Sequence, residues 1–217
     1  MVYLMKVLLP QLPTKLSRLT QAAERFKADD SITNSLIENE MLTSIGTKHV
    51  NISESRITKS DFTATTIERF ETLDCEFKSC NFTATKFVNS NWHVTLIEAA
   101  RCSGTQVSNS NFKNVTFKGC KLEMINFRFS NLENVIFEDC VLSDADFYNA
   151  KLKNVAFIQC TIKDITFAAA TMKNVDLSRS HIESITGINA LKGATISYDQ
   201  LMQLAPYLAA ESGIKIA

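Results

Sequence analysis

Three cysteines recur at intervals of twenty residues, and these thiols are the first feature of the chain that could bind a metal or react. Cys120, Cys140 and Cys160 keep the interval, and Cys80 lies two intervals before Cys120. A zinc ion takes four ligands in a tetrahedron, and no other Cys or His has the spacing to complete such a set. We therefore predict that the cysteines are small core residues, whose burial raises the thiol pKa and suppresses reactivity. The sequence predicts no metal and no cofactor.

The histidines and aspartates do not form a recognisable catalytic set. Three histidines are predicted to face solvent on well-separated segments, with no nucleophile or carboxylate beside them: His49, His93 and His181. Three aspartates stand directly before large apolar residues, where a short acidic side chain bonds the local backbone of a turn: Asp61, Asp146 and Asp176. Because catalysis needs convergent polar groups in a cleft, we predict that the chain is not an enzyme and has no small-molecule substrate.

A period of five residues runs through most of the chain and must position all of these side chains. Large apolar residues stand at every fifth position over most of residues 52–182, as Phe137 and Leu142 do, and smaller ones precede them by two positions, as Val135 and Cys140 do. An α-helix does not repeat at five, whereas residues two apart in an extended chain point the same way. Each unit is therefore a short extended piece followed by a turn. Such units bury a core only by stacking, which predicts an all-β solenoid.

The order of ring and aliphatic residues indicates how many units make one turn. Phenylalanine occupies every second centre from Phe117 to Phe167, with aliphatic residues between. Four units per turn would stack rings on rings and thiols on thiols, whereas three or five would mix shapes that pack poorly. Two or six units would also fit the alternation, so four is favoured and not proved. About eight turns over residues 31–190 predict a rod roughly 38 Å long, distorted where Phe70 and Thr72 exchange the usual sizes.

Several units resemble those of a known family. Residues 140–144 (CVLSD), 145–149 (ADFYN), 150–154 (AKLKN) and 130–134 (SNLEN) resemble the Ala-(Asp/Asn)-Leu-X-X consensus of pentapeptide-repeat proteins. The resemblance covers residues 31–190 and implies the family's fold, a right-handed quadrilateral β-helix. In size and in its C-terminal helix the chain also resembles the Qnr-type and mycobacterial fluoroquinolone-resistance members. That resemblance implies antibiotic resistance through mimicry of DNA and binding to a type II topoisomerase, DNA gyrase or topoisomerase IV.

A solenoid exposes its core at both ends, so caps are required. We predict an N-terminal helical cap over residues 1–30, the β-helix over 31–190, and a C-terminal helical cap and tail over 191–217. The first helix is expected to use Leu16, Leu19, Ala23 and Phe26, and the last to begin with a capping box between Ser197 and Gln200. The C-terminal apolar residues exceed what one cap needs and predict a homodimer interface: Leu201, Leu204, Leu208, Ile214 and Ile216. Alternatively, the tail folds onto its own last turn.

Composition excludes several classes of protein. The chain has 217 residues with 23 basic and 23 acidic side chains, so it offers neither the basic stripe that binds nucleic acid directly nor an acidic column. Its six cysteines show no pairing pattern, which is typical of a reducing compartment. Neither a signal segment nor a membrane span is evident, and we predict a cytoplasmic protein with no membrane partner.

Two sets of surface residues could recognise a protein partner. Apolar residues at positions predicted to face water form a candidate partner face: Leu96, Phe129, Ile136, Tyr148 and Ile158. Carboxylates that could imitate DNA phosphates are Glu68, Glu71, Asp74, Glu76, Glu138 and Asp139, with Lys59, Arg69, Lys78 and Lys118 close enough to offset them. The sequence therefore predicts a non-catalytic protein-binding rod that acts on a type II topoisomerase. The alternative is a scaffold or regulatory module with an unidentified protein partner.

Overall fold

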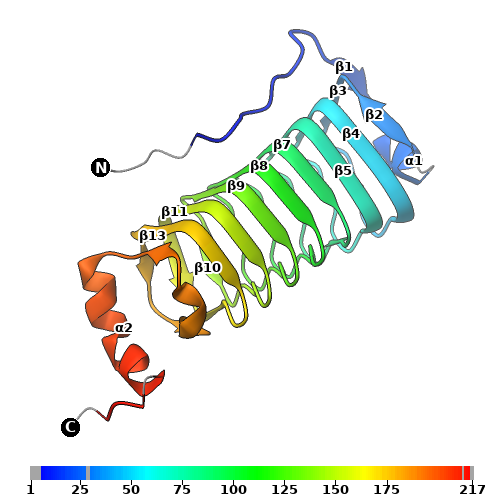
Figure 1. Cartoon of the computed structure of the whole chain (residues 1–217). Coiled ribbons are helices and arrows are strands. Elements are labelled where there is room, and N and C mark those ends of the chain that lie inside the picture. The colour runs from blue at the N-terminus through cyan, green and yellow to red at the C-terminus, as the bar shows by residue number, and fades with distance from the viewer. Residues whose placement is uncertain (1–5, 28–29, 212, 216–217) are drawn as a thin grey trace.

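Residues that are twenty apart in the sequence pair with each other, and this spacing defines the fold. Phe117 lies opposite Phe137, and Phe137 lies opposite Phe157. Four five-residue units therefore make one turn, as predicted, and the strands of successive turns are parallel. The result is a parallel β-solenoid of about nine turns (Figure 1). The computed structural model describes residues 6–27, 30–211 and 213–215.

Ten strands follow one another along the axis, and the other elements lie beside this stack or at its ends. The stack runs through β1 (Ser17–Leu19), β3 (Ser35–Glu38), β4 (Gly46–Thr58), β5 (Thr66–Lys78), β7 (Asn91–Glu98), β8 (Asn111–Lys118), β9 (Asn131–Glu138), β11 (Lys151–Lys163), β13 (Thr171–Ile182) and β15 (Ala194–Thr195). The shorter strands are β2 (Ser31–Thr33), β6 (Lys86–Phe87), β10 (Val141–Ser143), β12 (Ile165–Thr166) and β14 (Ile185–Thr186). The helices are α1 (Ala22–Lys27), the 3₁₀ helix η1 (Ile188–Leu191) and α2 (Tyr198–Glu211). The stack exceeds the expected eight turns because β1 and β15 extend it.

The corners of the solenoid are residues with a left-handed backbone. Such a residue stands two positions after the apolar centre in nearly every unit between Asn34 and Asn174, as in Asn134 (φ 56°), Asn154 (φ 53°) and Gly119 (φ 61°). The left-handed conformation costs an L-residue roughly 1–2 kcal/mol, and Gly, Asn and Asp tolerate it best. The frequent Asn and Asp residues between the apolar centres therefore serve the backbone of the corners.

Phenylalanine rings fill the core in two stacked columns. In one column, the rings of Phe117 and Phe137 lie 5.0 Å apart at 7°, and those of Phe137 and Phe157 lie 4.8 Å apart at 9°. In the other, Phe127 and Phe147 lie 4.8 Å apart at 15°. All five side chains are buried. The predicted stacking of ring on ring is confirmed, and its close ring contacts add to the free energy of burial.

The distortion expected around residues 65–74 is confined to one corner. Phe70 and Thr72 keep the normal register, opposite Val50 and Ile52 of the preceding turn. Both point inward and are buried, so the large and small side chains exchange places within the same turn. The corner at Arg69 is not left-handed, and β5 runs through it without a break. A compensating exchange of volume therefore preserves the stack.

The N-terminal end is closed by strand β1 and helix α1. Ser17–Leu19 pairs with β3, so the predicted helix is shorter than expected and begins only at Ala22. Ala22 and Phe26 are fully buried against the first turns. The carboxylate of Glu40 accepts hydrogen bonds from the amides of Gln21 (3.1 Å) and Ala22 (3.2 Å), which satisfies the helix start. Residues 6–16, here called the N-terminal arm, run back along the side of the solenoid (Figure 1).

Gln200 is buried and ties α2 to the last turns of the solenoid. Its Nε2 donates to the carbonyls of Leu177 (2.8 Å) and Ser180 (2.7 Å). The predicted capping box is confirmed, since Ser197 N donates to Gln200 Oε1 (2.8 Å) and Gln200 N donates to Ser197 Oγ (3.2 Å). Pro206 lies inside α2, which continues as a single helix. Among the described residues, no helix has the length and apolar character needed to cross a bilayer.

Candidate partner-binding surface

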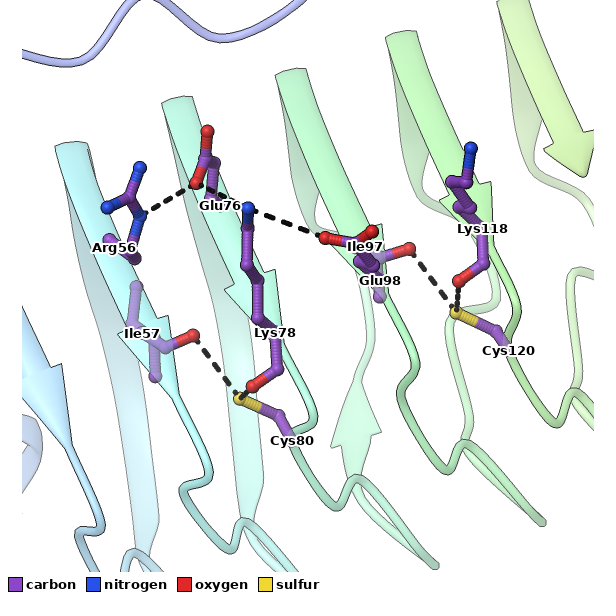
Figure 2. A network of polar contacts seen from close by, with 9 residues as sticks. All are labelled: Arg56, Ile57, Glu76, Lys78, Cys80, Ile97, Glu98, Lys118 and Cys120. Carbon is purple, nitrogen blue, oxygen red and sulfur yellow. Dashed lines mark hydrogen bonds and ion pairs between the residues drawn. The ribbon is translucent and has the colours of Figure 1, made fainter.

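The six cysteines are buried, and the thiols of all but Cys102 donate to backbone carbonyls. Cys140 Sγ donates to Phe117 O (3.4 Å), and Figure 2 shows the same arrangement at Cys80 and Cys120. Burial raises the pKa of Cys80 to about 12, and the thiols of Cys120 and Cys160, followed by burial, raise the pKa of Cys140. The neighbouring Cys140 thiol lowers the pKa of Cys120 and of Cys160, against the effect of burial. Because a thiol that stays protonated at neutral pH is a poor nucleophile, the raised pKa values make Cys80 and Cys140 unreactive. Across the described part of the chain, no group of three or more His, Cys, Asp or Glu side chains could hold a metal ion.

The prediction that no carboxylate lies beside a histidine is wrong for His49. Its Nε2 lies 3.5 Å from Glu71 Oε2, and both side chains are more than a third exposed. The two residues belong to neighbouring turns, so the stacking period of twenty brings them together. An ion pair this exposed is screened by water and contributes little to stability.

The three aspartates that precede apolar centres bond the local backbone, as predicted. Each accepts a hydrogen bond from the amide two residues further on: 2.8 Å for Asp61, 2.8 Å for Asp146 and 2.9 Å for Asp176. Burial acts to raise the pKa of Asp61, but hydrogen bonds from Thr63 and Asn81 outweigh it and lower the pKa. These carboxylates hold turns and are engaged by their own neighbours.

The candidate DNA-mimic carboxylates are interleaved with cations. Glu76 Oε2 lies 2.7 Å from Arg56 Nε and 3.3 Å from Lys78 Nζ, and Lys78 Nζ also lies 3.4 Å from Glu98 Oε2 (Figure 2). Positive and negative side chains therefore alternate from turn to turn along this side of the solenoid. Alternating charges cancel over a few ångströms, whereas duplex DNA presents an unbroken line of negative phosphates.

The remaining members of that set do not change this picture. Glu138 Oε1 lies 2.9 Å from Lys118 Nζ, and Asp74 accepts a hydrogen bond from the N-terminal arm. Within the described residues, Glu68 and Asp139 make no ion pair. Two isolated carboxylates on a neutral chain do not amount to a phosphate-like row.

The five apolar residues of the expected partner face lie in two separate places. Leu96 and Ile136 share one column, two turns apart, and Ile158 stands two positions along the strand in the neighbouring column. These three are half-buried. Phe129 and Tyr148 lie together elsewhere, with their rings 5.7 Å apart at 81°. The structure thus divides the predicted face into an aliphatic group and an aromatic pair.

Arg128 joins the aromatic pair and completes a cluster that sequence reasoning missed. Its guanidinium carbon lies 4.6 Å from the centroid of the Tyr148 ring and 5.8 Å from that of Phe129, and its Nη1 lies 3.5 Å from Asp146 Oδ2. Phe129 is 46% exposed and has a left-handed backbone (φ 59°). Met124, also exposed and left-handed, occupies the preceding corner. The cluster of Arg128, Phe129 and Tyr148 is called the aromatic cluster below.

The residues predicted for the dimer interface differ in exposure. Leu201 and Ile214 are exposed, Leu208 is half-buried, and Leu204 is only 3% exposed because it packs inward. Ile216 lies outside the described residues. Exposed residues of the same helix that the prediction omitted are Tyr198, Met202 and Tyr207. Beside the helix, an open hollow of about 550 Å³ is bordered by residues 185–188, Tyr207, Ala210 and Glu211.

Two family models match the chain. The model described as "Pentapeptide repeat region" matches residues 110–186, and the model described as "Pentapeptide repeats (8 copies)" matches residues 75–114. Together they span residues 75–186, which is just over half of the 217 residues. With the observed period of twenty and the parallel stack, these matches define the class: the chain belongs to the pentapeptide-repeat proteins. No curated protein matches the sequence.

The solved structures that the chain resembles are distant in sequence. The pentapeptide-repeat protein Rfr23 from the cyanobacterium Cyanothece 51142 is 11% identical, with a TM-score of 0.43 over 53% of this chain and 89% of Rfr23. Full-length QnrB1, a plasmid-mediated fluoroquinolone resistance protein, is 13% identical, with a TM-score of 0.41 over 80% of this chain and 99% of QnrB1. At these values the likenesses carry no partner or activity over to this chain.

Proposed function

We propose that this chain is a non-catalytic, protein-binding rod that contacts its partner through the aromatic cluster. The observation that carries the proposal is the conformation of Phe129, which combines an exposed ring with a left-handed backbone. The fold has no need of a ring there, because Asn109 and Asn149 fill the same corner one turn before and one turn after. A bulky residue held in a costly conformation at the surface is typical of a functional contact.

The chemistry of the cluster indicates the kind of partner. Aromatic side chains and arginine dominate the binding energy of protein interfaces, since they bury large areas and lose little rotamer entropy. Arg128 is held in place by the ring of Tyr148 and by Asp146, so its guanidinium is already ordered before binding. A partner surface that offers an apolar pocket for Phe129 next to a carboxylate for Arg128 would complement this cluster.

Replacing Phe129 by asparagine tests the proposal without disturbing the fold. We expect the free energy of unfolding to change by less than about 1 kcal/mol, because relief of the left-handed strain offsets the lost ring contact. Affinity capture from cell extract, quantified against wild type, should recover the partner at least about tenfold less well. The control is Gln159→Asn, which likewise places asparagine at an exposed left-handed corner (φ 53°), away from the cluster. Equal recovery by Phe129→Asn and wild type would contradict the proposal.

We also propose a homodimer formed through α2. Leu204 is the only apolar side chain of this helix that is fully buried, while Tyr198, Leu201, Met202 and Tyr207 stay exposed. Pairing of two helices would bury this surface and cover the open ends of both stacks.

Sedimentation tests this dimer. We expect the full chain to form dimers and the variant Met202→Glu/Tyr207→Glu to be monomeric. The control is Gln203→Glu, which adds a charge at an exposed polar residue of the same helix and should leave the dimer intact. A full chain that stays monomeric at high micromolar concentration would contradict the dimer.

Action on a type II topoisomerase remains a prediction. The alternation of Glu76, Lys78 and Glu98 leads us to expect at most weak mimicry of DNA. A gyrase supercoiling assay, run with and without quinolone at several salt concentrations, tests this, because electrostatic mimicry fades as salt screens the charges. If micromolar protein neither inhibits gyrase nor protects it from quinolone, action on the topoisomerase is contradicted. The alternative, a scaffold with another protein partner, then remains.

A further inference from the structure

The N-terminal arm has no helix or strand, yet it is anchored to a corner of the solenoid. Gln11 N donates to Asp74 Oδ1 (3.1 Å), across 63 positions of sequence. Figure 1 shows the arm running from β1 back along the stack, toward the C-terminal end. Pro10 and Pro13 lack amide donors and favour an extended backbone, so this stretch cannot extend the sheet with a full ladder of hydrogen bonds. It lies on the solenoid as a strap.

Two residues in the same corner column as Asp74 are buried although they occupy outward positions. Val94 is 7% exposed and Asn114 is 6% exposed. An extended chain advances about 3.3 Å per residue, and the turns are about 4.8 Å apart, so one turn is passed by about one and a half residues. Counting back from Gln11, residues 8–10 therefore reach the turns of Val94 and Asn114. Further along the same corner, past the described residues of the arm, exposure increases until Asn174 is exposed.

The arm has one side toward the solenoid and one side toward solvent. Val7, Pro10 and Leu12 are half-buried, whereas Leu8 and Leu9 are 55% and 61% exposed. Among the described residues, the hydrogen bond from Gln11 is the only one that joins the arm to the turns beneath it. A segment held by a few apolar contacts and one hydrogen bond opens at low free-energy cost compared with the core strands.

We propose that the surface under the arm is a groove for an extended, proline-containing apolar peptide of a partner protein, and that the arm is its built-in occupant. The groove, here called the arm groove, comprises Val94, Leu96, Asn114, Thr116 and Ile136, with Asp74 at one end to accept an amide of the peptide. In this proposal the half-buried apolar residues Leu96 and Ile136, which lie apart from the aromatic cluster, contact the bound peptide. A partner peptide binds by displacing the arm, so the arm lowers the apparent affinity of the groove.

Full-length variants that lift the arm test this proposal. Val7→Asp/Leu12→Asp places two charges on the side that faces the solenoid, and Leu8→Asp/Leu9→Asp places the same two charges on the side that faces solvent. A fluorescent synthetic peptide of residues 6–16 serves as the probe, with a scrambled peptide for comparison. We expect the first variant to bind the probe at least about tenfold more tightly than wild type or the second variant. Its amides at residues 94–97 and 114–117 should exchange hydrogen faster, and the probe should restore their protection.

Three results would overturn the proposal. The first variant could fail to bind the probe, bind it no better than the control variant, or bind the scrambled peptide equally well. Gln11→Pro provides an independent check that leaves the groove intact, because it removes the amide of the arm that donates to Asp74, and it should change probe binding in the same direction. Sedimentation of wild type and Val7→Asp/Leu12→Asp identifies the remaining alternative: dimers that disappear when the arm is lifted would mean that a second copy's arm occupies the groove. Probe binding and hydrogen exchange test the arm groove, whereas partner recovery by Phe129→Asn tests the aromatic cluster. Failure of one proposal can therefore be distinguished from failure of the other.

Discussion

Replacing Phe137 by alanine is expected to lower the free energy of unfolding by about 3–5 kcal/mol. The ring is fully buried and lies between Phe117 (5.0 Å) and Phe157 (4.8 Å), with Phe127 (6.0 Å) and Phe147 (6.1 Å) edge-on. Its removal leaves a cavity bordered by these four rings, which cannot close it without moving their own turns. Urea denaturation followed by circular dichroism measures the loss.

The control for this experiment must be an exposed residue whose side chain makes no structural hydrogen bond and whose backbone is not left-handed. Asn134, which the sequence places outward, is unsuitable because it donates to Asn114 (3.2 Å), accepts from Asn154 (3.0 Å) and forms a left-handed corner. Lys151→Ala is the better control, since Lys151 is exposed on β11, and we expect a change below about 0.5 kcal/mol. Equal losses for Phe137→Ala and Lys151→Ala would mean that the core is not where the structure places it.

The repeat architecture could be predicted because its signal is local and redundant. One missing centre, such as Thr72, does not obscure a period that recurs through the following turns, and the alternation of Phe137 with Leu142 reports how turns stack. The left-handed corners are encoded only in part, because Asn, Asp or Gly stands two positions after many of the centres whereas others carry residues such as Lys59, Met124 and Phe129.

The surfaces could not be predicted in the same way, because they depend on contacts between units that follow no repeat. The position of Arg128 over the Tyr148 ring depends on side-chain direction, and the period places only their Cα atoms. The arm carries no periodicity, so nothing in its sequence indicates that Gln11 meets Asp74. Likewise, the inward turn of Leu204 depends on how α2 is anchored by Gln200. The repeat therefore determines the stacked solenoid, whereas the segments and side chains that do not follow the repeat determine its binding surfaces.

Gly193→Ala is expected to destabilise the C-terminal cap by roughly 2–5 kcal/mol. Gly193 has a φ of 93°, and a Cβ there would stand 2.3 Å from Met172 O, a backbone atom of the turn beneath. The strand cannot move away, because β15 pairs with β13 directly after this residue. Gly187→Ala should behave similarly, since its Cβ would stand 2.4 Å from Ala168 N. Hydrogen exchange is expected to rise across η1 and α2, because both depend on the close approach of this loop to the last turn.

Gly104→Ala separates the effect of the clash from the effect of the backbone angle. Gly104 is also left-handed (φ 68°), but a Cβ there would have no neighbour within 4 Å. Ala84 already occupies the same corner one turn earlier with a φ of 54°, so alanine is accommodated at about 1 kcal/mol. If Gly193→Ala cost no more than Gly104→Ala in urea denaturation, the loop would lie further from Met172 than the structure places it. A loss confined to Gly193→Ala, accompanied by faster exchange in α2 and unchanged exchange in β8 and β9, would show that the cap unfolds separately from the stack. That separation is expected for a quasi-one-dimensional fold, whose ends are held only by their nearest turn.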